Sequence, residues 1–259
     1  MALGNEMVPI FCYHSIGPSP LSIPRDIFEE QLGSIKRAGL STLTLSQLLT
    51  LRHADQLRAV VLTFDDCFMD VYENALPLLR DNGCAATFFP VPGYDGVTRW
   101  GSAVERRWSD VRTGTFTIPF SYMGERERHE LVNHGMEIGA HTLTHANLDL
   151  IDPIQRDEEI VHSKAHLEKE LGVVAKSFCY PRGRYTLEVM NAVQHAGFLL
   201  ACTTKSGYFH PTCNAFELPR FPAVRDPEIF RSILEGKGGL LPLHRRIVKK
   251  AARLVRQGT

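Results

Sequence analysis

Short runs of apolar residues recur along the whole chain. They are continuous instead of alternating with polar residues, which is typical of strands covered on both faces. The runs occupy residues 7–12, 40–45, 59–64, 85–91, 135–140, 176–180 and 198–203. We therefore predict seven short, buried strands.

The segments between these runs carry apolar residues at helical spacing. We predict helices over residues 26–38, 70–82, 153–171 and 186–196. The third helix has the clearest boundaries, because Asp152 is a suitable N-cap, Pro153 occupies the first helical position and Gly172 follows the last turn. Thr186 and Gly197 bound the fourth helix in the same way.

Strands that alternate with helices predict an α/β fold with parallel strands and crossover helices. No glycine-rich nucleotide-binding loop follows a strand, so we expect a closed or nearly closed barrel with its chemistry at the carboxyl ends of the strands. Residues 92–123 break the alternation and contain both tryptophans, Trp100 and Trp108, which indicates a long insertion or lid. We expect one domain over residues 1–236 and a short tail over 237–259.

Polar residues follow two of the predicted strands. Asp65 and Asp66 come directly after the third strand, and His141 and His145 follow the fifth. Adjacent carboxylates after a buried strand are costly unless a cation compensates their charge. Two histidines four residues apart can face one cation from a helical turn or from a tight loop. One carboxylate and two imidazoles leave open positions for water and substrate.

Each pair also has a simpler interpretation. An aspartate pair after a strand can be a helix N-cap beside a solvated neighbour, and a His-x-x-x-His pair can be a surface feature. Because both pairs follow buried strands in one alternating chain, we favour a divalent metal site.

Three motifs carry a resemblance to a known family: TFDD at 63–66, HTLTH at 141–145 and FCYPRG at 178–183. The chain resembles the NodB-homology polysaccharide deacetylases, carbohydrate esterase family 4, over about residues 7–225, with 92–123 poorly matched. The opening Tyr13-His14-Ser15 is similar to the branch that contains the poly-N-acetylglucosamine deacetylases.

The resemblance implies a distorted (β/α)7 barrel. It also implies hydrolysis of N-acetyl groups on an amino sugar in a polysaccharide, an oligosaccharide or a lipid-linked glycan. Asp65 would be the general base, and Asp66, His141 and His145 would bind one divalent metal. Zn²⁺ is the default for this ligand set, with Co²⁺, Ni²⁺ or Mn²⁺ as alternatives.

The chain departs from the family pattern at the general acid and at the arginine that accompanies the base. The usual Leu-x-His motif has no clean match, and we assign His14 as the general acid, with a simple strand-end cap as the alternative. Cys179 stands where the family has an arginine, so we expect Arg182 or Arg220 to lie near Asp65, unless either forms an ordinary ion pair. A nearby cation would lower the pKa of Asp65.

The third motif is expected to contact the substrate. The backbone N–H of Arg182 corresponds to the family's oxyanion donor, and Tyr180, Pro181 and Arg182 are candidates for lining the sugar pocket. Tyr180 can equally well pack in the core. Trp100 and Trp108 could stack on sugar rings or hold the insertion in place.

Charge is distributed unevenly along the chain. The 259 residues carry no net charge, but no acidic residue follows Glu235, so the preceding 236 residues carry −7 against seven lysines and arginines in the tail. Residues 243–256 show the pattern of a basic amphipathic helix lying on an anionic membrane surface. Packing of that helix on its own barrel is the alternative, and we expect no nucleic-acid binding.

The six cysteines show no CxxC spacing, so we expect free thiols. Residues 1–9 lack the pattern of a signal peptide. These features favour a cytoplasmic protein, peripheral at the inner membrane face if the tail binds lipid. Two other functions stay open: a cyclic amide hydrolase, as in some relatives, and a carbohydrate-binding domain whose catalytic site has decayed.

Overall fold

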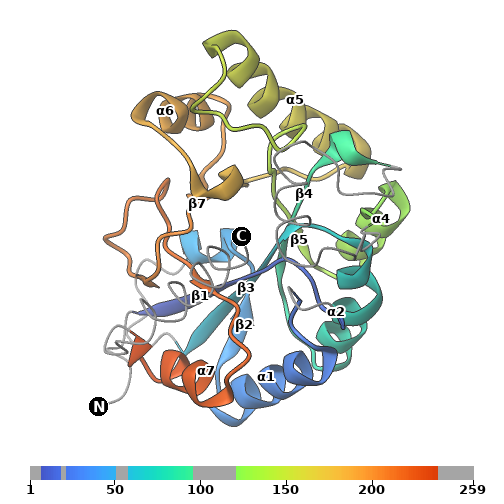
Figure 1. The fold of residues 1–259 in the computed structure, drawn as a ribbon, viewed down its shortest axis with the longest axis vertical. Helices are drawn as coiled ribbons and strands as arrows, with labels where there is room; N and C mark the ends of the chain where they lie inside the picture. The colour runs from blue at the N-terminus through green and yellow to red at the C-terminus, as the bar shows by residue number, and fades with distance from the viewer. Residues whose placement is uncertain (1–6, 19–21, 51–57, 96–120, 239–259) are drawn as a thin grey trace, which may run out of the picture.

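A computed structural model describes residues 7–18, 22–50, 58–95 and 121–238 of the chain. Parallel strands form its centre (Figure 1). One edge of β3 (Ala59–Asp66) pairs with β1 (Val8–Tyr13). The other edge pairs with β2 (Ser41–Leu43) along its first half and with β4 (Thr87–Pro90) along its second half. The next strand beyond β4 is β5 (Glu137–Ile138).

Single bridges close these strands into a ring. Ala140, just after β5, bridges Phe178 of β6 (Ser177–Cys179), and β6 pairs with β7 (Leu200–Cys202). Cys202 then bridges Leu218, and the segment continues into β9 (Phe221–Pro222), which pairs in parallel with β1. A short strand, β8 (Tyr208–Phe209), adds to β1 in antiparallel orientation. The predicted barrel is confirmed, and its distortion lies at the two single bridges.

Helices lie around the outside of the strands (Figure 1). The predicted helices correspond to α1 (Arg25–Arg37), α2 (Met69–Asp81), α5 (Pro153–Leu171) and α6 (Leu187–His195). Their predicted ends are also confirmed. The Asp152 side chain accepts from the N–H groups of residues 154 and 155, Thr186 caps α6, and Gly172 adopts a left-handed φ of 65° after α5.

The sequence pattern missed two helices, α4 (Glu125–Asn133) and α7 (Pro227–Leu234). In α4 the buried positions include two charged residues, Glu127 and Arg128, so the apolar periodicity is weak. The second missed helix has a clear apolar face but only eight residues, which is short for a periodicity-based prediction. Three short 3-10 helices, Ser46–Thr50, Pro92–Tyr94 and Pro181–Gly183, complete the helical elements of the described residues.

Strand alternation determines which side chains enter the ring. On β3, Val61 belongs to the inner apolar cluster, whereas Val60, Leu62 and Phe64 belong to the cluster beneath the helices. Because successive side chains point to opposite faces, Thr63 and Asp65 follow Val61 into the ring. A buried carboxylate is thus placed inside the barrel at the carboxyl end of its central strand.

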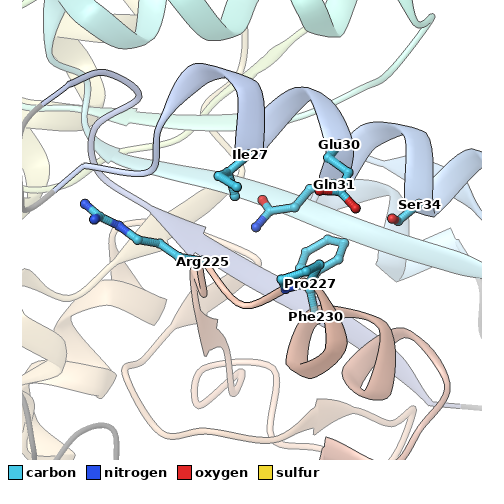
Figure 2. A pocket seen from close by; sticks show the side chains of 7 residues that line it. All are labelled: Ile27, Glu30, Gln31, Ser34, Arg225, Pro227 and Phe230. Atoms are coloured by element: carbon cyan, nitrogen blue, oxygen red, sulfur yellow. The ribbon is translucent and has the colours of Figure 1, made fainter.

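Between α1 and α7 lies a surface pocket whose lining is partly apolar (Figure 2). Gln31 projects into it, donates to the Val224 carbonyl at 2.6 Å and accepts from the Tyr13 hydroxyl at 2.7 Å. The first bond joins α1 to the segment that precedes α7, and the second joins α1 to β1. No metal-binding cluster of the described residues includes a residue of this pocket.

Two predicted segments lie outside the described residues. Most of the predicted insertion, with Trp100 and Trp108, falls in 96–120, and the basic amphipathic segment falls in 239–259. Among the described residues, none of the helices combines the length and apolar character needed to cross a bilayer.

Candidate metal centre and active site

Three side chains from two strand ends converge at the rim of the barrel. Asp66 is the last residue of β3, and His141 and His145 lie in the loop after β5. Asp66 Oδ1 is 3.6 Å from His141 Nε2 and 3.5 Å from His145 Nε2. One ligand atom from each of the three residues lies within 4.8 Å of the other two, which is the separation expected around one shared cation.

Residues with a left-handed backbone conformation change the direction of the chain at and beside the candidate metal ligands. Within the described residues, five non-glycine residues have positive φ: Asp66, Cys67, Thr142, His145 and Arg182. All five lie in the three sequence motifs or directly beside them. Such conformations cost roughly 1–3 kcal/mol each and persist only where the surroundings enforce them. At Asp66 the φ of 65° ends the strand geometry and accompanies the turn of its carboxylate toward the histidines.

A backbone hydrogen bond sets the orientation of His141. Its Nδ1 lies 2.7 Å from the Cys179 carbonyl oxygen, which can only accept, so Nδ1 carries the proton and Nε2 presents its lone pair toward Asp66. Burial and the neighbouring His145 lower the pKa of His141 to about 4. Neutral imidazole nitrogens beside a carboxylate oxygen form a donor set that fits a divalent ion such as zinc.

Asp65 lies inside the ring and is held by Arg220. The guanidinium donates from Nη1 to Oδ1 at 2.7 Å and from Nη2 to Oδ2 at 2.8 Å, and both side chains are almost fully buried. Burial alone would raise the pKa of Asp65. The charge and hydrogen bonds of Arg220 outweigh burial and hold the pKa of this carboxyl well below its usual range.

Every N–H of the Arg220 guanidinium has an acceptor. Besides Asp65, Nε donates to the Thr203 carbonyl at 3.0 Å, Nη1 to Thr63 Oγ1 at 3.0 Å and Nη2 to Cys179 Sγ at 3.1 Å. Five donors therefore meet acceptors from three different segments of the barrel. This arrangement makes a buried arginine acceptable and fixes the position of the carboxylate.

Two thiols and an imidazole approach the Oδ2 oxygen of Asp65. Cys12 Sγ donates to it at 3.3 Å and Cys179 Sγ at 3.4 Å. His14 Nε2 lies 3.9 Å from the same oxygen, and the His14 side chain is 55% exposed. The structure thus places His14 at the same rim as the metal-ligand candidates, between Asp65 and solvent.

A family model described as polysaccharide deacetylase matches residues 53–201, more than half of the chain. The chain belongs to the polysaccharide deacetylase family. It is 28% identical over 204 residues to YxkH of Bacillus subtilis (strain 168), covering 77% of this chain and 65% of YxkH. The chain therefore spans less than two thirds of that relative.

Two further similarities agree with this family membership. The chain is 22% identical over 201 residues to the poly-beta-1,6-N-acetyl-D-glucosamine N-deacetylase of Staphylococcus aureus (strain MSSA476), covering 77% of this chain and 67% of that one. It superposes on the Streptococcus pyogenes deacetylase PplD in complex with acetate with a TM-score of 0.71 at 26% identity, covering 85% and 93% of the two chains.

The structure decides between the alternatives left open for two residues of the third motif. Arg182 is not the partner of Asp65, because its Nη1 donates to Asn147 Oδ1 at 2.8 Å while Arg220 occupies the carboxylate. Tyr180 does not line a sugar pocket with its side chain: it is 1% exposed, and its hydroxyl donates to the Phe216 carbonyl at 3.2 Å.

Pro181 is also buried, so the partly exposed residues of the third motif are Arg182 and Gly183. Tyr180 instead stacks on Tyr185 at 4.7 Å between ring centroids. The sequence left both possibilities open because a strand residue one position beyond the paired segment can face either the rim or the core, and the sequence pattern does not distinguish these directions.

Three polar contacts of the site, made by Cys12, Cys179 and Glu159, were not predicted from the sequence. The thiols look like ordinary strand hydrophobes in the sequence. A signal for Glu159 was available, because it lies four residues before Ser163 and eight before Leu167, on the buried stripe of α5. A carboxylate on a buried stripe indicates a polar partner on the facing element.

Proposed function

We propose that the chain is a metal-dependent N-deacetylase that removes acetyl groups from the amino sugars of a glycan. The observation that carries this proposal is the convergence of Asp66, His141 and His145 within 4.8 Å of one another, beside a buried aspartate that is held ionised. In this proposal the three residues bind one divalent cation, for which Zn²⁺ is the default.

Hydrolysis of an amide requires an activated water, a stabilised oxyanion and a protonated leaving amine. The cation, when bound, would lower the pKa of a water molecule and polarise the acetyl carbonyl. Asp65 is assigned as the base that would take a proton from the attacking water. A carboxylate oxygen of Asp65 lies within 4.8 Å of a ring nitrogen of His141, which supports this assignment.

Arg220 supports the role of Asp65 by keeping it charged. A buried aspartate without a cation would hold its proton and could not act as a base. The two hydrogen bonds from Arg220 also restrict the carboxylate to one orientation, so proton transfer needs no side-chain reorganisation.

His14 is assigned as the acid that protonates the leaving amine. Its exposed imidazole lies 3.9 Å from Asp65 Oδ2 and faces solvent, where a sugar ring would enter. The reaction then consumes one water, releases acetate and leaves a free amine on the sugar. The oxyanion donor predicted at the Arg182 backbone N–H stays part of the proposal.

The similar proteins guide the choice of substrate. The Staphylococcus aureus relative is named for poly-beta-1,6-N-acetyl-D-glucosamine, and PplD was solved with acetate. We therefore propose N-acetylglucosamine residues in a polymer or oligomer as the substrate class and acetyl as the leaving acyl group.

Acetate release from N-acetylglucosamine oligomers tests the proposal. Wild type, Asp65→Asn, His141→Ala and the control His162→Ala, an exposed histidine on α5, would be compared with metal content measured in the same samples. We expect Asp65→Asn to lose activity and keep metal, His141→Ala to lose both, and the control to keep both. Near-normal turnover of Asp65→Asn would refute the role of the base. Bound metal without acetate release by wild type would refute the activity.

A further inference from the structure

Two of the three residues between the metal-ligand candidates, Leu143 and Thr144, are held by a carboxylate from a different element. Glu159 of α5 accepts the Leu143 N–H at 2.9 Å and the Thr144 N–H at 2.8 Å through Oε2. Its Oε1 accepts the Thr144 hydroxyl at 2.6 Å. One side chain thus accepts three hydrogen bonds from two consecutive loop residues.

The carbonyl oxygens of the same loop are held from the opposite side. The Gly93 N–H donates to the Leu143 carbonyl at 2.8 Å, and the Tyr94 hydroxyl donates to the Thr144 carbonyl at 3.0 Å. A Cβ on Gly93 would lie 2.5 Å from the Leu143 carbonyl oxygen, so only glycine permits this approach. The short helix Pro92–Tyr94 therefore packs against the loop without a gap.

Both sets of contacts act on a strained segment. Thr142 has a φ of 63° and His145 a φ of 58°, in the left-handed region that non-glycine residues avoid. Without outside hydrogen bonds the loop would relax toward ordinary backbone angles and turn His145 away from Asp66. Metal affinity depends on the ligands being oriented before the ion arrives, and partners one shell outside the ligands commonly change it 10–100-fold.

We propose that Glu159 is a positioning residue that sets the metal affinity of the site by holding the His141–His145 loop against Gly93. This inference rests on the proposed metal site and adds a residue that touches neither metal nor substrate. The carboxylate is suited to the task because it only accepts hydrogen bonds, while the loop offers two N–H groups and a hydroxyl. Glutamine keeps the three contacts if its oxygen faces the N–H groups and its amide donates to Thr144.

The affinity of the metal-free protein for Zn²⁺, measured by competition with a chelator of known affinity, tests the proposal without reference to activity. We expect Glu159→Ala to weaken binding about tenfold or more and Glu159→Gln to restore most of it. Gly93→Ala should weaken binding in the same direction, because the added methyl group displaces the loop from the other side. Glu158→Ala, one exposed position away on α5, should bind like wild type.

Thermal unfolding of the metal-free variants separates positioning from general stability. Unchanged affinity in Glu159→Ala, whether or not its melting temperature falls, would overturn the proposal. If Glu159→Ala does not fold, the same Zn²⁺ titration of Gly93→Ala tests the proposal. A Zn²⁺ affinity of Gly93→Ala equal to that of wild type then overturns it. Failure of the underlying metal site looks different: wild type itself would bind no better than His141→Ala.

Discussion

Replacing Arg220 by methionine removes a buried cation beside Asp65. Arg220 and Asp65 are 1% and 5% exposed in their side chains, and two charge-assisted hydrogen bonds of 2.7 and 2.8 Å join them. Methionine fills much of the same volume but donates no hydrogen bond. Asp65 then lies in the barrel as an uncompensated charge or takes up a proton, because burial becomes the dominant influence on its pKa and raises it.

The magnitude follows from the contacts that are lost. Two hydrogen bonds to a charged group contribute about 1.5–3 kcal/mol each, and breaking a buried ion pair by removing one partner costs about 3–5 kcal/mol. The remaining donors of Arg220, which contact Thr203, Thr63 and Cys179, leave further acceptors without partners. We expect Arg220→Met to lower the free energy of unfolding by about 4 kcal/mol.

A double-mutant cycle isolates the ion pair from the other contacts. Urea unfolding of the metal-free protein at neutral pH would be measured for wild type, Arg220→Met, Asp65→Asn and the double variant. The double variant should be less destabilised than the sum of the two single variants by about 2 kcal/mol or more. The free energy of unfolding of Arg220→Lys should lie between those of wild type and Arg220→Met, because an ammonium group cannot bind both carboxylate oxygens as the guanidinium does.

If the losses in the free energy of unfolding of the two single variants add up to that of the double variant within about 0.5 kcal/mol, Arg220 and Asp65 are not coupled as expected. Such a result would mean that Arg220 stabilises the barrel through Thr203, Thr63 and Cys179 and not through Asp65. In that case the depressed pKa of Asp65 would need another cause, and its assignment as an ionised base would lose its structural support.

Three further predictions follow from other parts of the structure. His141 should make the metal-free wild type lose stability relative to His141→Gln as the pH falls from about 6.5 toward 4, by up to about 1.4 kcal/mol per pH unit. In that window the unfolded chain binds a proton that the folded protein excludes from His141, whose pKa is lowered to about 4 by burial and by His145. Urea titrations of both proteins at several pH values would measure this difference, in which contributions shared by the two proteins, such as that of Asp70, cancel. Burial raises the pKa of Asp70 to about 6, against a hydrogen bond from Ser15, so its ionised form opposes folding above that pH. Asp70→Asn should therefore gain stability relative to wild type as the pH rises from about 4 to about 6, by roughly 2 kcal/mol; a difference that does not change with pH would refute the shift. Gly139→Ala should destabilise the fold by about 1–3 kcal/mol, because a Cβ there would lie 2.4 Å from both Phe89 and Ser177. Chemical denaturation would measure this loss, and an unchanged midpoint would show that the neighbours can move.

Local patterns predicted the parts of this protein that depend on neighbouring residues. The continuous apolar runs identified β1 to β7 but not the two-residue strands β8 and β9, and the caps Asp152 and Thr186 act at the helix ends where they were expected. The failures occurred where the pattern was short or charged. α4 buries Glu127 and Arg128 on the face that packs inward, and Arg128 forms ion pairs with Asp95 and Glu170 at 2.6 Å.

The candidate site also contains residues that the sequence identified and one that it did not. The metal-ligand candidates were visible in the sequence because each pair comes from a single strand end. The partner of the base was not, because Arg220 lies 155 residues from Asp65 and the sequence left Arg182 as an equal choice. The closed ring places Arg220 at Asp65 and places Arg182 at Asn147.

By itself the sequence determined that buried strands alternate with helices and that carboxylates and imidazoles follow two of them. Both are consequences of local spacing. The tertiary structure decided which arginine meets Asp65, that Tyr180 packs in the core and that Glu159 reaches the histidine loop. These contacts depend on how the ring closes through the single bridges Ala140–Phe178 and Cys202–Leu218. Closure brings distant segments within hydrogen-bonding distance, and no spacing along the chain encodes that approach directly.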